Sequence, residues 1–118
     1  MKKTFILLAL FTLFALSYSC KKNPDNWSTI KSLHKTYKNG EISECTLDGE
    51  KVYHCALNAY DAGSSIYNAE GDLIGSCNYA WGTPDSICSQ LENCVVIYRI
   101  KDNIWGQSSI DKYDLGEN

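Results

Sequence analysis

The stretch EISECTLDGEKVYHCALN, residues 41–58, decides the fold. Its centre, Asp48-Gly49, lies between two runs rich in strand-forming residues, and a type I′ hairpin turn needs positive φ at both central positions. A two-residue turn here sets the pairs that lie opposite each other: Leu47 and Glu50, Cys45 and Val52, Ile42 and Cys55. Because side chains alternate between the two faces of a strand, Cys45 and Cys55 point to opposite faces. We therefore expect these two cysteines not to bond to each other, unless a longer turn shifts the register.

Three further segments of the chain also have the pattern of strands. Residues 64–78 predict a second hairpin, with strands at about 64–68 and 72–78 and Gly71 in the left-handed position of the turn. The run CVVIYRIKDNIW, residues 94–105, is dense in β-branched and aromatic residues on both faces, which is typical of a central strand. A weaker alternation near residues 108–113 predicts an edge strand.

An amphipathic helix is predicted near the start of the chain, over residues 26–38. Its apolar side chains recur at three- and four-residue spacing: Trp27, Ile30, Leu33, His34 and Tyr37. Asn39-Gly40 is a good stop signal, because glycine and asparagine tolerate the left-handed conformation that ends many helices.

A second, shorter helix is predicted before the long strand. Thr83 is a candidate N-cap and Pro84 suits the first helical position. Ile87, Cys88 and Leu91 would then form its inward stripe, and the helix would end near Asn93.

These elements predict an α+β fold. We expect a small, mostly antiparallel sheet made of two hairpins and a C-terminal strand, with the N-terminal helix packed on one face. The predicted organisation is a signal peptide at 1–19, a lipidated tether at 20–26, a single domain at 27–113 and a disordered tail at 114–118.

The N-terminal segment has the three parts of an export signal. Lys2 and Lys3 are basic, and Phe5 to Leu16 is an apolar run that is too short to span a bilayer comfortably. The small residues Ser17 and Ser19 then predict cleavage after residue 19.

Cys20 would be the first residue of the mature chain, and it has two interpretations. The segments FILLALFTLFAL and SYSC resemble the signal peptides of bacterial lipoproteins, in which this cysteine takes a diacylglycerol on its thiol. The usual motif has Leu three places before the cysteine, where this chain has Ser17. The resemblance implies a membrane anchor at Cys20; the alternative is plain secretion, with Cys20 in a disulfide.

The cysteine count favours plain secretion, whereas the position of Cys20 at the predicted cleavage site favours lipidation. The chain has six cysteines, at positions 20, 45, 55, 77, 88 and 94. Plain secretion leaves an even number, enough for three bridges, whereas lipidation of Cys20 leaves two bridges among Cys45, Cys55, Cys77, Cys88 and Cys94 and one odd thiol. We expect Cys77 to pair with Cys88 or Cys94 across a short loop. Both interpretations place the protein outside the cytoplasm, where disulfides persist.

The sequence offers few signals of chemistry. No short-spaced Cys or His pair predicts a metal site, and no motif predicts a cofactor or a catalytic residue. His34 and His54 are interpreted as boundary residues of a helix and a strand. The net charge of −3, which removal of Lys2 and Lys3 makes more negative, disfavours nucleic acid as a partner. A deep pocket that held His54 or an odd thiol beside carboxylates would favour an enzyme.

A candidate binding face lies in the C-terminal half of the chain. Tyr79, Trp81 and Trp105 fall in predicted loops, where aromatic side chains can anchor a protein partner or stack on a sugar. The alternative is that they cover a small core.

The body of the chain, with LDGEKVYHC and IYNAEGDLIG, resembles small cysteine-containing envelope lipoproteins of unknown function. The resemblance implies a non-enzymatic protein, held by its lipid in a bacterial envelope membrane (the outer one is favoured), that binds an unknown protein partner or has a structural role. The alternatives are a periplasmic inhibitor or immunity-type protein, and a freely secreted or periplasmic three-disulfide domain.

Overall fold

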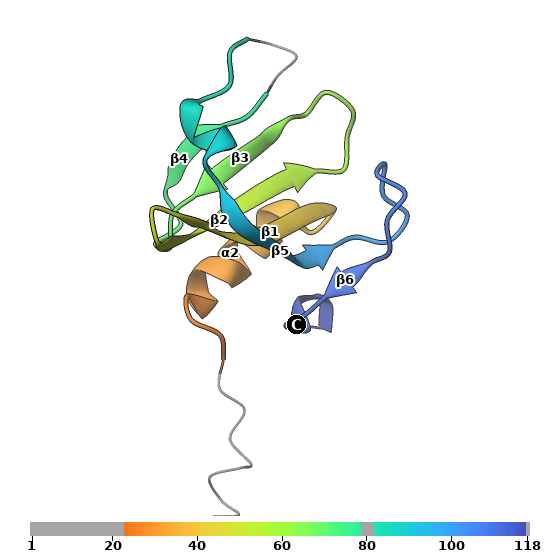
Figure 1. The fold of residues 1–118 in the computed structure, drawn as a ribbon. Helices are drawn as coiled ribbons and strands as arrows, with labels where there is room; N and C mark the ends of the chain where they lie inside the picture. The colour runs from red at the N-terminus through yellow and green to blue at the C-terminus, as the bar shows by residue number, and fades with distance from the viewer. Residues whose placement is uncertain (1–22, 79–81, 118) are drawn as a thin grey trace, which may run out of the picture.

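The computed structural model describes residues 23–78 and 82–117, and it confirms the α+β class (Figure 1). Residues 1–22 lie outside this part, so the predicted signal peptide, Cys20 and most of the tether do too. The elements are α2 (Trp27–Tyr37), β1 (Gly40–Leu47), β2 (Glu50–Leu57), β3 (Ser64–Tyr67), β4 (Leu73–Ser76), η1 (Ser86–Ser89), β5 (Glu92–Arg99), β6 (Ile110–Asp111) and η2 (Leu115–Glu117). The strands form one antiparallel sheet in the order β4-β3-β2-β1-β5-β6.

The β1–β2 hairpin has the predicted register. Asp48 and Gly49 form the turn with φ of 51° and 81°, both in the left-handed region. The pairs opposite each other are the ones the sequence predicts: Leu47 with Glu50, Cys45 with Val52 and Ile42 with Cys55. The two cysteines therefore lie on opposite faces of the sheet.

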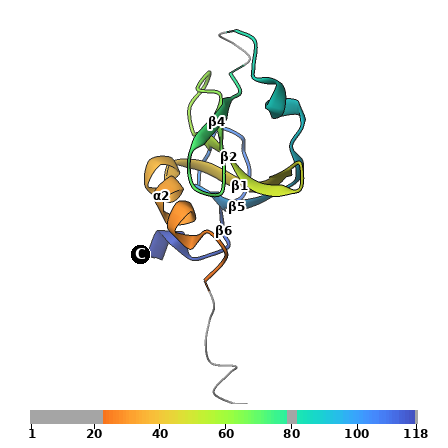
Figure 2. The ribbon, with the colours of Figure 1, turned by 90° about the vertical axis from the view of Figure 1, so that its left-hand side faces the viewer.

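The sheet separates two apolar cores. On one face, α2 buries Ile30, Leu33 and Tyr37, whose spacing places them on one side of the helix, against Tyr53 and Cys55 of β2. On the other face, the second core contains Cys45, Val52, Ile66 and Cys77, with Ile87, Cys88 and Leu91 packed against it. Figure 2 shows α2 and the η1 segment on opposite sides of the strands.

The helix also has a fixed direction relative to the strands. At its start, Thr29 Oγ1 donates to the carbonyl of Ala69 (2.7 Å), in the β3–β4 turn. At its end, the hydroxyl of Tyr98 donates to the carbonyl of Lys38. The beginning of α2 therefore lies at the end of the sheet that carries the hairpin turns, and its end lies where β1 starts.

Two disulfides hold the segment after β4 to the sheet. Cys77 bonds to Cys88, one of its two predicted partners, whereas Cys94 bonds to Cys45. Cys55 is a free, fully buried thiol in the core under α2. The loops closed by the two bridges, with sequence separations of 11 and 49, correspond to roughly 3 and 4 kcal/mol of stabilisation if the effect is loop-closure entropy.

The second predicted α-helix is wrong. Residues Ser86–Ser89 form a single turn of 3-10 helix, and Thr83 and Pro84 precede it in non-helical backbone. Asp85 explains the difference, because its Oδ2 accepts a hydrogen bond from Ser76 N (2.8 Å) and its own N–H donates to Ser76 O (3.1 Å). These bonds and the Cys77–Cys88 bridge hold the segment along the outer edge of β4, where edge strands need cover.

The strand predicted within residues 94–105 is confirmed as an interior strand, because β5 lies between β1 and β6, but its predicted extent is wrong. β5 starts at Glu92 and ends at Arg99, and its first four residues are exposed. β1 and β2 lie in the middle of the sheet, whereas β6 covers β5 only opposite Tyr98 and Arg99. A bulge in β5 places the neighbouring residues Ile97 and Tyr98 in the same core, a side-chain direction that strict alternation does not predict.

Residues 115–117, within the predicted disordered tail of 114–118, have regular structure. Leu115–Glu117 form a 3-10 turn, in which Leu115 N donates to Asp111 Oδ1 (2.7 Å). The Leu115 side chain is 2% exposed and belongs to the α2 core. The tail therefore closes one side of that core.

The same substitution, leucine to alanine, at a buried and at an exposed position tests whether Leu115 belongs to the core. Leu115→Ala should lower the free energy of unfolding by about 2–5 kcal/mol, because it deletes a buried side chain and leaves a cavity. Leu73→Ala, at a side chain that is 62% exposed, should change it by less than about 0.5 kcal/mol. Urea unfolding measures both values, and equal effects would contradict the buried position of Leu115.

Candidate functional site

A cleft of about 380 Å³ lies at the end of the sheet opposite the hairpin turns, and we name it the His54 cleft. The β2–β3 connector (58–63) and the loop after β5 lie at this end of the molecule (Figure 1). The cleft is lined by Glu41, His54, Ala56, Leu57, Ala59, Tyr60, Asp61, Ala62, Gly63, Ser64, Cys77, Ile104 and Trp105. This mixture of apolar walls and a few polar groups is typical of binding sites.

A second, larger hollow of about 720 Å³ lies at the turn end of the sheet. It is lined by residues of both hairpins, among them Asp48, Glu50, Lys51 and Glu70. Among the described residues, its lining has no aromatic ring and no histidine, so it offers fewer groups that could orient a ligand.

His54 and Ser64 form a hydrogen-bonded pair in the cleft. They lie on the neighbouring strands β2 and β3, and His54 Nε2 is 2.7 Å from Ser64 Oγ. Burial lowers the pKa of His54, and the negative charge of Glu41 opposes this shift. His54 is therefore mostly neutral at pH 7, and one ring nitrogen can accept a hydrogen bond while the other donates.

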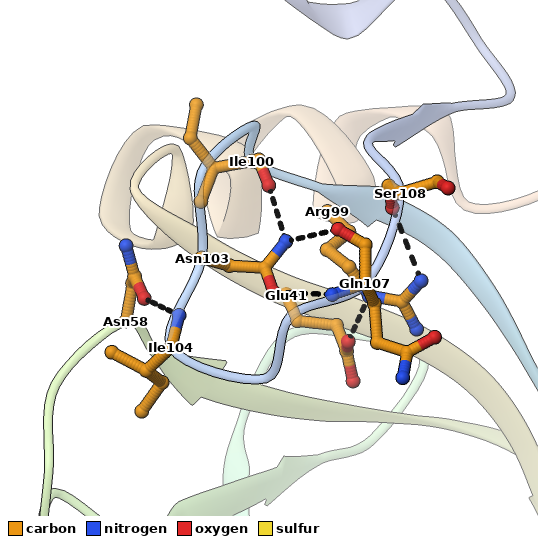
Figure 3. Close-up of polar contacts among 8 residues, drawn as sticks. All are labelled: Glu41, Asn58, Arg99, Ile100, Asn103, Ile104, Gln107 and Ser108. Carbon is orange, nitrogen blue, oxygen red and sulfur yellow. Dashed lines mark hydrogen bonds and ion pairs between the residues drawn. The ribbon is translucent and has the colours of Figure 1, made fainter.

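Glu41 and Arg99 form an ion pair beside this histidine. Arg99 Nε donates to Glu41 Oε2 at 2.5 Å, and the two side chains are only 14% and 20% exposed. Arg99 Nη1 also donates to the carbonyl of Ser108 (3.2 Å), so the guanidinium group bonds to β1 and to the loop after β5 (Figure 3). The pair neutralises Glu41 and holds the loop that follows β5.

That loop is organised around the side chain of Asn103. Its Nδ2 donates to the carbonyls of Ile100 and Gln107, both at 2.8 Å, and its Oδ1 accepts from Gln107 N at 3.1 Å (Figure 3). Ile104 N donates to Asn58 Oδ1 (2.8 Å), which ties the loop to the β2–β3 connector. Trp105 therefore sits on a loop that is hydrogen-bonded internally and to the opposite wall of the cleft.

The rim of the cleft exposes apolar and aromatic side chains. Tyr60 is 82% exposed and Leu57 is 44% exposed, although both are large. Of the predicted binding face, Trp105 lines the cleft and is half-buried, whereas Tyr79 and Trp81 lie outside the described residues. Tyr60 is not among the residues predicted from the sequence, because it is a single aromatic residue in a connector without apolar periodicity.

The polar groups of the cleft do not form a catalytic triad. A serine nucleophile needs a histidine whose second nitrogen is held by a carboxylate. Glu41, the carboxylate whose charge acts on His54, instead accepts a hydrogen bond from Arg99 at its Oε2. The free thiol is not part of the cleft, and burial strongly raises the pKa of Cys55, which keeps it protonated.

Metal and membrane signals are absent from the part of the chain that the structure describes. No three His, Cys, Asp or Glu side chains in residues 23–78 and 82–117 come close enough to hold a metal ion. Within the same residues, no helix has both the length and the hydropathy needed to cross a membrane. Comparison of the chain with protein-family models, with curated proteins and with solved structures found no match.

The two half-buried histidines predict how stability depends on pH. The pKa of His54 and that of His34 are both lowered, mainly by burial, so the unfolded chain binds more protons than the folded chain below about pH 6.5. Their contribution to stability is present above that pH and falls as the pH drops towards the lowered values. Near His34, the charge of Asp111 opposes the shift and that of Lys38 adds to it.

Thermal unfolding at pH 7.5 and 5.5 checks this expectation. The His54→Gln variant, which keeps a polar group near Ser64, should lose less stability between the two pH values than the wild-type protein does. His34→Gln serves as the matched comparison on the other face of the sheet. A pH dependence unchanged in both variants would show that other groups govern it.

Proposed function

We propose that this protein is a membrane-anchored, non-catalytic envelope lipoprotein whose His54 cleft binds a partner protein. The observation that carries the proposal is that the exposed ring of Tyr60 and the ring of Trp105 line the same cleft, whose connector and loop are hydrogen-bonded to each other. Aromatic side chains of this kind anchor protein partners, because they supply contact area at a small entropic cost.

The two disulfides support export from the cytoplasm. Bridges such as Cys45–Cys94 and Cys77–Cys88 persist in oxidising compartments, which include the periplasm and the cell surface. This agrees with the export signal that the first 19 residues predict.

The free thiol supports lipidation of Cys20 over a third disulfide. Four of the five cysteines after residue 20 are paired, so a disulfide of Cys20 would need Cys55. Cys55 is 0% exposed in the core under α2, and an N-terminal thiol could reach it only if that core opened. The freely secreted three-disulfide alternative is therefore disfavoured.

The lipid anchor is tested by Cys20→Ala. We expect this variant either to fail to mature or to move from the membrane to the soluble envelope fraction, because the acyl acceptor is gone. Cys55→Ala is the matched control, and it should stay in the membrane fraction with an intact mass that includes the acyl chains. Normal processing and membrane association of Cys20→Ala would contradict the proposal.

The binding cleft is tested separately by site-specific photo-crosslinking in the native cell. A photoreactive amino acid at position 60, on the rim, should give a covalent adduct with one protein partner. The same amino acid at position 73 is the control, since Leu73 is exposed at the turn end of the sheet. Trp105→Ala should remove the adduct from position 60, and equal adducts from both positions, or none from position 60, would refute a partner in the cleft.

A further inference from the structure

The charge of the His54 cleft has a single sign. Its lining includes the carboxylates of Glu41 and Asp61 and no lysine or arginine, among the residues that the structure describes. His54, which faces Glu41 from β1 and Ser64 from β3, also lines the cleft, and it is mostly neutral at pH 7 because burial lowers its pKa. Because Arg99 already balances Glu41, the remaining charge is that of Asp61, which is exposed in the β2–β3 connector.

The walls of the cleft suit a long aliphatic chain. Its lining includes the apolar side chains of Leu57, Ala59 and Ala62 and the rings of Tyr60 and Trp105. A basic side chain has the matching shape, because its methylene stem can cover apolar surface while its charged end stays near water. Its charged end is also attracted to the face of a tyrosine or tryptophan ring.

From these two features together, we propose that the His54 cleft takes a basic side chain, arginine or lysine, of the protein partner. The stem lies against Leu57 and the alanines, and the cation lies between the aromatic rings and the carboxylate of Asp61. A neutral His54 leaves the cleft without a competing positive charge, and the negative net charge of the protein favours encounter with a basic surface. This inference rests on the proposed function and specifies the chemistry of its partner.

Three matched peptides test the inference with the mature protein in detergent. They are hexapeptides with blocked ends and uncharged side chains at every position except one central residue, which is arginine, lysine or citrulline. Citrulline has nearly the shape of arginine without the charge. We expect the arginine and lysine peptides to bind with a change in Trp fluorescence, and the citrulline peptide to bind at least about tenfold more weakly, by isothermal titration. Equal binding of citrulline, or no binding of any peptide, would overturn the inference.

Two substitutions locate the peptide in the cleft. Asp61→Asn keeps the shape and tolerates the left-handed backbone at this position (φ 59°), so it removes the charge alone. It should weaken binding of both basic peptides about fivefold or more and leave the thermal midpoint unchanged. Glu70→Gln, an exposed acid at the other end of the sheet, is the control and should change nothing. An equal loss in both variants would mean attraction to the net charge, not binding in the cleft, and would overturn the proposal.

The two proposals can fail independently. A partner crosslinked from position 60 whose binding does not depend on a basic residue would leave the binding function in place and refute the inference. Peptides that bind the cleft, with no crosslinked partner in the cell, would refute the binding function in the cell and leave the preference of the cleft for a basic side chain in place.

Discussion

The two-residue turn at Asp48-Gly49 is the constraint on which the rest of the structure depends. It fixes the register of β1 on β2, and the register assigns every side chain of these central strands to one face of the sheet. A slip by one residue would reverse the faces of one strand relative to the other, and Cys45 and Cys55 would then lie on the same face of the sheet. Both cores, the Cys45–Cys94 bridge and the candidate site follow from this one turn.

The elements that could be predicted from the sequence are those whose structure depends on residues close together in the chain. The hairpin, its register and α2 depend on a turn dipeptide and on periodic apolar residues, and they are confirmed. The segment after β4 is different. Asp85 is hydrogen-bonded to Ser76 and Cys88 is disulfide-bonded to Cys77, and these contacts with β4 and its end outweigh the local preference for a helix. Leu115 was missed for the same reason, since its burial depends on a helix almost 80 positions earlier in the chain.

The candidate site shows a similar division. Trp105 could be selected from the sequence because it is an aromatic residue in a loop, and the cleft includes it. Glu41, His54, Tyr60 and Ser64 belong to β1, β2, the β2–β3 connector and β3, and only the order of strands brings them together. The ion pair of Glu41 with Arg99 needs β5 beside β1, a pairing that no local pattern predicts.

The direction of α2 along the sheet has a consequence for how copies of the protein act together. The helix begins at the hairpin turns and ends near the cleft, so a chain held in a membrane through the residues before α2 presents the cleft at its far end. Many copies in one membrane would then present their clefts in the same direction. A partner with several basic side chains could engage several of them at once, and avidity would make a weak single contact into a long-lived attachment.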